Sequence, residues 1–303
     1  MNRLKTVICG VEFKNPVIAA SGSYGFGREY NEFYPISEIG GISCKGITLE
    51  PRDGNAPPRV AETPCGMLNA VGLQNPGVRH FVEKEVPWIK EQGTVCIANI
   101  AGNAVEDYAE AAAVVNDSAV DMVELNVSCP NVKHGGMQFG TTCAALSEVV
   151  CAVRKNLAKP LIVKLSPNVT DITELARAAA DSGADALSLI NTLLGMRIDI
   201  RTRRPVLRNN MGGFSGNAVF PVAVRMVWQV KNAVNIPVIG MGGITDYKQA
   251  VEMMMAGADA IQVGTANFTD PFAMPKIING LQRYCEDNGI GNIGEIVGTV
   301  RAW

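Results

Sequence analysis

The stretch 160–186, PLIVKLSPNVTDITELARAAADSGADA, decides the fold because the chain contains a second copy of it. The second copy, 237–260, reads PVIGMGGITDYKQAVEMMMAGADA. Each copy has an apolar strand, a Thr-Asp pair, a helical stretch and a Gly-Ala-Asp tripeptide, which caps the helix and leads into the next strand. The repeated unit is therefore one strand–helix–strand module of a parallel sheet.

Outward from this repeat, short apolar runs alternate with helical patterns along the whole chain. The expected strands are Pro16–Gly22, Gly41–Thr48, Thr94–Gly102, Met122–Pro130, Pro160–Pro167, Ala186–Thr192, Pro237–Ile244 and Ala260–Ala266. The expected helices are Val105–Asn116, Ala144–Leu157, Asp171–Ser182, Pro221–Val234 and Asp246–Ala256. Eight strands with intervening helices in 303 residues favour a closed α/β (β/α)8 TIM barrel over an open sheet.

Two segments depart from this rhythm. Leu4–Ile8 and Val11–Phe13 predict an N-terminal β-hairpin that plugs the bottom of the barrel. The proline-rich segment Glu50–Gly77 predicts a long structureless loop over the active-site mouth, and such loops tend to be functional. No linker divides the chain, so we expect a single domain over residues 1–303.

Composition excludes several classes of function. The net charge of -2 and the absence of a basic stripe give no sign of a nucleic-acid partner. No apolar run reaches the length that spans a membrane, and no signal peptide precedes the first strand, so we expect a cytoplasmic protein. The eight cysteines are dispersed without a C-x-x-C pair and the two histidines are isolated, so we expect no metal site on this chain.

Polar residues end the expected strand at 122–130, where the sequence reads Asn126-Val-Ser-Cys129-Pro-Asn131. Polar groups at the carboxyl ends of barrel strands belong to active sites. A thiol among amides is a candidate general base or nucleophile, and the alternative is a buried structural cysteine beside a turn. Because similar polar endings recur at the other strands, we interpret Cys129 as functional.

Glycines end the seventh and eighth strands, at Gly240-Met-Gly-Gly-Ile244 and Gly264-Thr-Ala266. Loops after these two strands commonly bind phosphate in barrels, because backbone N–H groups can approach an anion there. Glycines that only permit tight turns are the alternative. The pattern favours a phosphorylated ligand.

Lys45 and Lys164 lie within apolar strands, where a buried ammonium is costly unless negative charge pairs with it. A lysine that reaches solvent at a strand end is the alternative. Asn99, Asn126 and Asn191-Thr192 add amides and a hydroxyl, which suit a ligand with alternating carbonyl and N–H groups. One shared anionic ligand at a single mouth explains the set.

A glycine-rich string near the C-terminus, Gly289-Ile-Gly-Asn-Ile-Gly294, matches the dinucleotide-binding pattern G-x-G-x-x-G. It follows an expected helix rather than a strand, and no strand–helix–strand unit can follow it. We reject it, so the chain offers no Rossmann unit for direct NAD binding.

Four motifs together resemble the dihydroorotate dehydrogenase family over essentially the whole chain. They are Asn126-Val-Ser-Cys-Pro-Asn131, Ser43-Cys-Lys-Gly-Ile-Thr48, Asn69-Ala-Val-Gly-Leu-Gln-Asn75 and Gly240-Met-Gly-Gly-Ile244. The run 132–140, VKHGGMQFG, is similar to the catalytic subunit of the NAD-linked, heteromeric class 1B. The lack of an N-terminal membrane-associating extension, and a cysteine where the quinone-linked class has serine, argue against that class.

The resemblance implies an FMN-binding barrel that oxidises (S)-dihydroorotate to orotate in pyrimidine (UMP) biosynthesis. The implied FMN contacts are Ser21, Lys45, Gly46, Asn99, Asn126, Lys164, Ile190, Gly216, Gly242, Gly243, Gly264 and Thr265, with the phosphate on the last four. The implied substrate contacts are Lys45, Asn69, Ala70, Val71, Gly72, Leu73, Asn126, Asn191 and Thr192, with the Asn69 segment as a lid.

The implied catalytic residues are Cys129, Lys45 and Lys164. Cys129 would take the C5 proton while hydride passes from C6 to flavin N5, and Lys164 would stabilise the charge of reduced FMN. The family's assembly is a homodimer of catalytic subunits with electron-transfer subunits that carry FAD and a [2Fe–2S] cluster, together a heterotetramer, through which electrons reach NAD.

Four alternatives stay open at this point. They are a fumarate-linked homodimeric enzyme of the same family, an enzyme acting on dihydrouracil, a flavin-free phosphate-binding barrel lyase or synthase, and a non-catalytic binding barrel. The first would be active with fumarate without a partner, and the third would purify colourless. The sequence assigns no role to Cys65.

Overall fold

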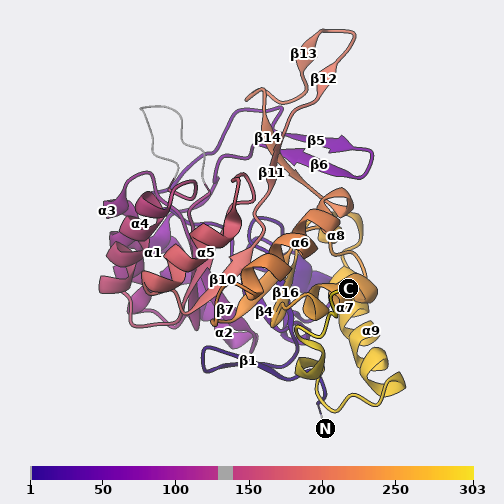
Figure 1. The fold of residues 1–303 in the computed structure, drawn as a ribbon. Helices are drawn as coiled ribbons and strands as arrows, with labels where there is room; N and C mark the ends of the chain where they lie inside the picture. Colours follow the sequence, from indigo (N-terminus) through magenta and orange to yellow (C-terminus); the bar gives the residue numbers. More distant parts are fainter. Residues whose placement is uncertain (1, 129–138) are drawn as a thin grey trace.

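The computed structural model describes residues 2–128 and 139–303, and eight parallel strands close into a barrel within them (Figure 1). In order around the barrel they are β3 (Val17–Ala19), β4 (Gly41–Ser43), β7 (Val95–Ile100), β8 (Met122–Asn126), β9 (Leu161–Lys164), β10 (Ala186–Leu189), β15 (Val238–Met241) and β16 (Ala260–Val263). β16 pairs with β3 to close the ring. The predicted barrel is confirmed, and each strand lies within its expected range.

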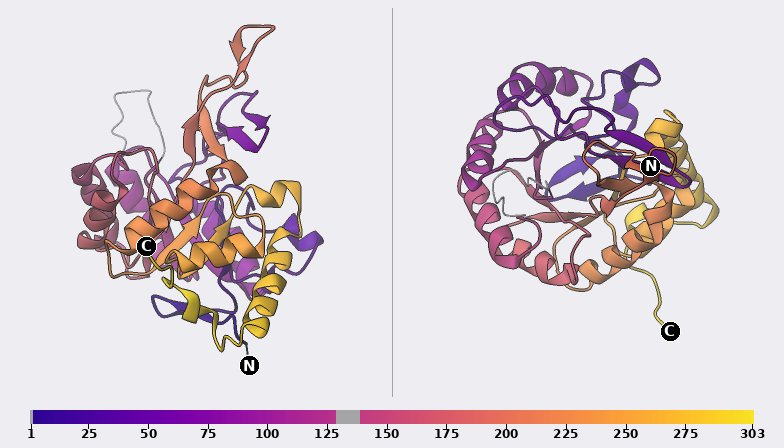
Figure 2. Two further views of the ribbon diagram at one scale, coloured as in Figure 1. Left: turned by 45° about the vertical axis from the view of Figure 1, so that its right-hand side comes forward. Right: turned by 90° about the horizontal axis from the view of Figure 1, so that it is seen from above.

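Helices surround the barrel, as the view from above shows (Figure 2). The longer ones are α3 (Val105–Asn116), α4 (Cys143–Lys155), α5 (Ile172–Asp181), α6 (Phe220–Lys231), α7 (Tyr247–Met255) and α9 (Ala273–Asp287). Shorter segments are α1 (Val78–His80), the π-helix η3 (Phe81–Glu85), α2 (Val86–Glu91) and α8 (Ala266–Thr269). Single 3-10 turns are η1 (Tyr30–Glu32), η2 (Ile36–Glu38), η4 (Asn217–Val219) and η5 (Ile293–Ile296). All five predicted helices are present.

Side-chain caps begin several of these helices. Thr142, Asp171 and Asp246 each accept a hydrogen bond from a backbone N–H in the first turn of α4, α5 and α7. Such caps satisfy N–H groups that have no partner within the helix. At the other end, Gly183 and Gly257 adopt φ of 107° and 123°, as the repeated Gly-Ala-Asp tripeptide predicts.

The aspartate of that tripeptide ties the amino ends of neighbouring strands together. Asp185 accepts the N–H of Leu161 at 2.7 Å, and Asp259 accepts that of Val238 at 2.8 Å. Asp121 does the same for Cys96 at 2.8 Å. Each carboxylate also pairs with a basic side chain from the helix that precedes the strand whose N–H it accepts; these are Lys90 with Asp121, Arg154 with Asp185 and Lys231 with Asp259.

The N-terminal hairpin is formed by β1 (Thr6–Ile8) and β2 (Val11–Phe13), which pair antiparallel. Ile8 and Phe13 are fully buried against inward-facing side chains of the barrel strands, including Ile18 and Met122. The hairpin therefore plugs the amino end of the barrel, as predicted. A larger apolar cluster lies between the strands and the surrounding helices.

Above the carboxyl end stands a four-stranded sheet in the order β11-β14-β6-β5 (Figure 1). Its strands are β5 (Val60–Thr63), β6 (Gly66–Asn69), β11 (Leu193–Gly195) and β14 (Gly212–Ser215). A small hairpin of β12 (Ile198–Asp199) and β13 (Arg204–Pro205) projects beyond it.

This sheet corrects the prediction of a structureless loop over 50–77, because that segment contains β5 and β6. Their pairing with each other and with β14 satisfies backbone groups that a long loop would leave to water. In the described ranges 2–128 and 139–303, no helix combines the length and apolar character needed to cross a bilayer.

Candidate functional site

The carboxyl ends of the barrel strands carry most of the residues predicted to form the site. Lys45 and Gly46 follow β4, Asn99 is in β7, and Asn126 and Lys164 end β8 and β9. Ser21 follows β3, Ile190, Asn191 and Thr192 follow β10, Gly216 follows β14, Gly242 and Gly243 follow β15, and Gly264 and Thr265 follow β16. Parallel strands bring these positions to one mouth, the usual location of barrel active sites.

Below the mouth, a fully buried carboxylate organises the barrel interior. Glu124 of β8 lies on the same face of its strand as Met122, which packs in the inner apolar cluster. Its Oε2 accepts hydrogen bonds from Ser43 Oγ and Asn99 Nδ2, both at 2.6 Å. Its Oε1 accepts from Ser188 Oγ at 2.8 Å and Gln262 Nε2 at 2.7 Å.

Lys164 supplies the countercharge, with Nζ 4.0 Å from Glu124 Oε2 and a side chain only 7% exposed. Burial by itself raises the pKa of the Glu124 carboxyl. The attraction of Lys164 and the hydrogen bonds from Ser43, Ser188 and Gln262 outweigh burial, so the pKa lies below its ordinary value. The floor of the site therefore holds an ionised carboxylate next to a buried ammonium.

Asn99 presents an acceptor that has no partner among residues 2–128 and 139–303. Its Nδ2 bonds to Glu124, and its Oδ1 is buried and unsatisfied. Gly46 lies beside this oxygen, because a Cβ at Gly46 would come 3.0 Å from Asn99 Oδ1 and 3.2 Å from Leu73 Cδ2. Ser21 Oγ is 4.0 Å from the same point. A ligand N–H group would satisfy the oxygen, and the absence of a side chain at Gly46 keeps the approach open.

A second part of the mouth is lined by glycine and hydroxyl groups. Gly216, Gly242 and Gly243 adopt φ of 112°, 123° and 79°. A Cβ at Gly243 would lie 2.9 Å from Gly216 O, and one at Gly242 would lie 3.1 Å from Ile190 Cγ1. These contacts bring the turns after β14, β15 and β10 together, which is the backbone arrangement that anion sites use.

Next to this turn, the Thr265 hydroxyl donates to Ser215 Oγ at 2.8 Å. A Cβ at Gly264 would make ordinary van der Waals contact, at 3.5 Å from Ala20 Cβ and 3.8 Å from Ser23 Oγ. The predicted phosphate residues therefore lie along one stretch of the mouth, and Ser215 joins them as a residue that the sequence did not reveal.

Lys45 is largely buried, and its pKa is lowered first by burial and then by repulsion from Arg59. None of the carboxylates described in the structure forms an ion pair with it. An anionic ligand would stabilise the charged form of Lys45, because its negative charge would offset both the burial and the repulsion from Arg59.

The side-chain amides at the ends of β8 and β10, the two strands that flank β9, contact each other. Asn191 Nδ2 donates to Asn126 Oδ1 at 3.3 Å, and the backbone N–H of Thr192 donates to Asn191 Oδ1 at 2.7 Å. The backbone oxygen of Asn126 accepts from the Tyr108 hydroxyl at 3.0 Å. These bonds fix the orientation of both amides.

The residues predicted to form a lid, 69–73, do not all contact the same part of the molecule. Asn69 ends β6 and its Nδ2 lies 3.5 Å from Gly213 O, and Leu73 reaches Gly46. Ala70, Val71 and Gly72 instead contact Asn55 and Arg59. Cys65 is exposed at the turn before β6, where its carbonyl accepts the N–H of Ala218. Cys129 lies outside the described residues.

Sequence reasoning missed the inward-facing residues of the floor, namely Ser43, Glu124, Ser188 and Gln262. A signal for them existed. Glu124 lies two residues after Met122 and two before Asn126, so strand alternation places all three on one face.

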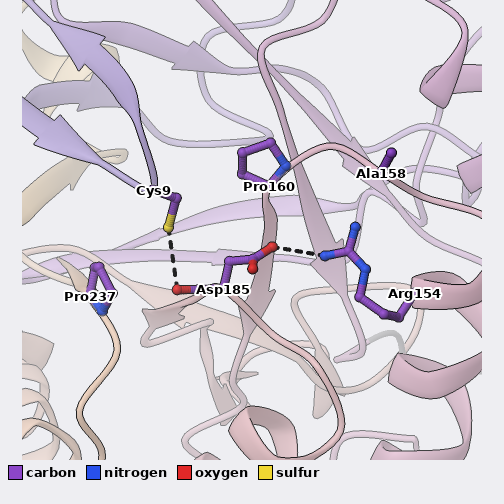
Figure 3. A pocket seen from close by; sticks show the side chains of 6 residues that line it. All are labelled: Cys9, Arg154, Ala158, Pro160, Asp185 and Pro237. Carbon is purple, nitrogen blue, oxygen red and sulfur yellow. Dashed lines mark hydrogen bonds and ion pairs between the residues drawn. The ribbon is translucent and has the colours of Figure 1, made fainter.

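A separate pocket of about 640 Å³ lies at the opposite, amino end of the barrel (Figure 3). Cys9 donates from Sγ to the carbonyl of Asp185 at 3.3 Å there, beside the Asp185–Arg154 ion pair. Burial, followed by the charges of Asp185 and Asp259, raises the pKa of Cys9 to about 11. A thiol that stays protonated is a poor nucleophile, so Cys9 gives this pocket no nucleophilic character.

The fold and the mouth together define a class: a closed (β/α)8 barrel with buried lysine, oriented amides and glycine-rich turns at its carboxyl end. Within that class the chain belongs to the dihydroorotate dehydrogenase family. The profile described as "Dihydroorotate dehydrogenase" matches residues 3–285.

Curated relatives are similar over nearly the full length of the chain, and each is named "Dihydroorotate dehydrogenase B (NAD(+)), catalytic subunit". The protein of Bacteroides thetaiotaomicron is 56% identical over 301 residues, which cover 99% of each chain. That of Alkaliphilus metalliredigens is 54% identical over 297 residues, or 98% of each. That of Geobacillus kaustophilus is 52% identical over 304 residues, covering all of this chain and 96% of the relative.

Proposed function

We propose that residues 1–303 act as one FMN-binding domain that oxidises (S)-dihydroorotate to orotate in pyrimidine biosynthesis. The observation that carries the proposal is the floor of the mouth, where Glu124 contacts both Lys164 and Asn99, and Asn99 Oδ1 lies against Gly46. The names of the relatives, which cover almost the whole chain, support the same reaction.

The described residues fit a flavin mononucleotide. The buried Asn99 Oδ1 lacks a partner in the described part of the chain, and it would accept a hydrogen bond from a ring N–H. Gly216, Gly242 and Gly243 form a cradle in which any side chain would clash, and Thr265 adds a hydroxyl for a phosphate. Ser21, Lys45, Gly46, Asn126, Lys164, Ile190 and Gly264 complete the proposed contacts.

When bound, FMN would supply the hydride acceptor at its N5. This chain's residues would do the rest. Lys45, with no carboxylate partner among the described residues, would bind the carboxylate of dihydroorotate and orient the ring. Asn69, Asn126, Asn191 and Thr192 would hold its alternating carbonyl and N–H groups, since amides offer both donors and acceptors. The segment from Ala70 to Leu73 would close over the substrate and exclude water.

Cys129 is our proposed general base for the proton at C5. It follows the Asn126-Val-Ser sequence at the end of β8, and its own position lies beyond the described part of the chain. A thiol ionises nearer to neutral pH than a hydroxyl and so needs less assistance as a base. Lys164 would stabilise the negative charge that reduced FMN carries.

Electrons would leave through a partner that carries FAD and a [2Fe–2S] cluster and that reduces NAD. Support comes from the relatives' names, which specify NAD(+) and a catalytic subunit. It also comes from the rejected string Gly289–Gly294, which lies in the turn and 3-10 segment after α9 rather than after a strand. We propose a cytoplasmic heterotetramer of two catalytic and two electron-transfer subunits.

The first experiment is an anaerobic visible spectrum of the purified chain before and after dihydroorotate. A flavin band that bleaches is expected; a colourless protein that refuses added FMN would overturn the proposal. Reduction of fumarate without any partner would instead assign the electrons to the homodimeric, fumarate-linked type.

The role of Cys129 is tested by stopped-flow flavin reduction of Cys129→Ala. We expect reduction slowed by at least about 100-fold, the usual contribution of a general base. Cys151→Ala, which removes an exposed thiol on α4, is the matched control and should reduce at the wild-type rate. Wild-type reduction by Cys129→Ala would exclude the thiol as the base.

A further inference from the structure

Glu124 uses its full hydrogen-bonding capacity inside the barrel. Its two oxygens accept four hydrogen bonds, from β4 and β7 on one oxygen and from β10 and β16 on the other. Lys164 of β9 lies 4.0 Å away. One carboxylate therefore connects five other strands, and every contact is with a side chain that is itself buried.

This network decides which atom Asn99 offers to the mouth. An ionised carboxylate only accepts, so the Asn99 atom that faces it must be the amide nitrogen. The oxygen is then left over, buried and without a partner in the described ranges, next to the Cβ position of Gly46. Without Glu124, nothing among the described contacts would stop the amide from turning over.

The same carboxylate balances the charge of Lys164. A lone ammonium in a site this buried would present its full positive charge to any ligand above it. With Glu124 ionised at 4.0 Å, the pair is close to neutral overall and the ammonium is held in place.

We propose that Glu124 is a positioning residue of the flavin site: it fixes Asn99 as an acceptor and sets the positive potential that Lys164 delivers. This inference rests on the proposed function. Glu124 itself would touch neither the substrate nor the reacting atoms. It would act through the two residues above it.

The test is a double-mutant cycle on the midpoint potential of the bound flavin, with Glu124→Gln and Lys164→Met singly and together. Reduction adds negative charge to the flavin, so removing the Glu124 charge while Lys164 remains should raise the potential. In the Lys164→Met background the same change should have much less effect. Equal shifts in both backgrounds, or no shift in either, would overturn the proposal.

FMN binding to the apoprotein gives a second readout. Glu124→Gln places an amide N–H₂ against one pair of donors, and we expect the FMN dissociation constant to rise about tenfold or more as the floor rearranges. Asp259→Asn, at the far end of the barrel, is the control for general destabilisation and should leave both affinity and potential unchanged. A wild-type chain without FMN would defeat the proposed function, whereas normal FMN binding and potential in Glu124→Gln would defeat only the positioning role.

Should Glu124→Gln fail to fold, Lys164→Met answers the question alone. Infrared spectra of protein with isotope-labelled glutamate would follow the carboxyl band of protonated Glu124 as pH falls. Because Lys164 lowers the pKa of that carboxyl, the band should appear at higher pH in Lys164→Met than in the wild type. Its appearance at the same pH in both proteins would show that the two residues are not coupled.

Discussion

At the scale of single residues, the proposed anion cradle depends on the surroundings of its glycines rather than on their number. Gly243 and Gly10 have nearly the same φ, 79° and 81°. Their surroundings differ: a Cβ at Gly243 would lie 2.8 Å from Phe220, while one at Gly10 would meet nothing within 4 Å. The pair therefore separates the cost of a left-handed backbone from the cost of a clash.

We expect Gly10→Ala to lower the free energy of unfolding by about 1 kcal/mol, the cost of alanine at positive φ. Gly243→Ala should cost more, because backbone and side-chain atoms of Phe220 must move, and it should also weaken FMN binding. Urea unfolding and FMN titration of both variants provide the measurements. Equal destabilisation with unchanged FMN affinity would contradict the assignment of Gly243 to the cradle.

The sequence predicted the residues that reach the mouth, but not those beneath it. Lys45, Asn99 and Lys164 were conspicuous because charged or amide groups interrupt apolar runs. Ser43 and Ser188 gave no comparable signal, because a small serine side chain does not visibly interrupt an apolar strand pattern. Their role depends on where Glu124 points, and that depends on the closure of a barrel whose strands are far apart in the sequence.

At the scale of elements, the repeated Gly-Ala-Asp tripeptide does more than end a helix. Its aspartate, Asp185 or Asp259, accepts the first N–H of the preceding strand and pairs with a basic side chain from the helix before that strand. Asp121, which ends no such tripeptide, makes the same kinds of contact with Cys96 and Lys90. The pattern fixes strand to strand and helix to strand at the amino end of the barrel. It was visible in the sequence as a repeat, but its partners were not.

Asp259→Asn retains an acceptor for Val238 and removes the charge that pairs with Lys231. We expect a loss of about 1–2 kcal/mol in the free energy of unfolding, since hydrogen bonds to charged groups are stronger than neutral ones. Asp287→Asn, on an exposed position at the end of α9, should change it by less than about 0.5 kcal/mol. Denaturant unfolding measures both, and equal effects would deny the aspartate its role as a tie.

Strands and helices with local sequence patterns were predicted correctly, whereas the four-stranded sheet over the mouth was not. β5 and β6 are short and lie among prolines, and β6 pairs with β14 from a segment far along the chain. Such non-local pairing leaves no periodicity in either segment for sequence reasoning to detect. The barrel strands, by contrast, pair with their neighbours in sequence order.

At the scale of the whole molecule, ligand binding and folding should be linked. Asn99 Oδ1 is buried without a partner in residues 2–128 and 139–303, and a bound ligand N–H group would satisfy it. A ligand that binds the folded chain alone stabilises it by mass action, by about 2.7 kcal/mol at 100 times its dissociation constant. Unfolding of the apoprotein with and without FMN at that ratio should show this gain, and at the same FMN concentration Gly243→Ala should gain less. An unchanged unfolding curve would contradict the linkage.

Acid should destabilise the fold partly through Glu124. Because the pKa of this carboxyl is lower in the folded chain than its ordinary 4.5, the unfolded chain binds more protons as pH falls. The contribution is therefore fully present above pH 4.5 and is lost as pH decreases toward the folded value. Stability curves measured across this range should fall less steeply for Glu124→Gln than for the wild type; parallel curves would contradict an ionised Glu124.

The antiparallel pairing of β6 with β14 joins the two halves of the four-stranded sheet above the mouth. Asn69 stands at one end of it and Gly216 directly follows the other. Asn69 therefore cannot move away from the mouth without β14, which leads directly into Gly216, unless the pairing of the two strands breaks. Under the proposed function, product release past Asn69 and phosphate binding at Gly216 would therefore be coupled. The rate of product release would depend on how rigidly the turn at Gly216 is held.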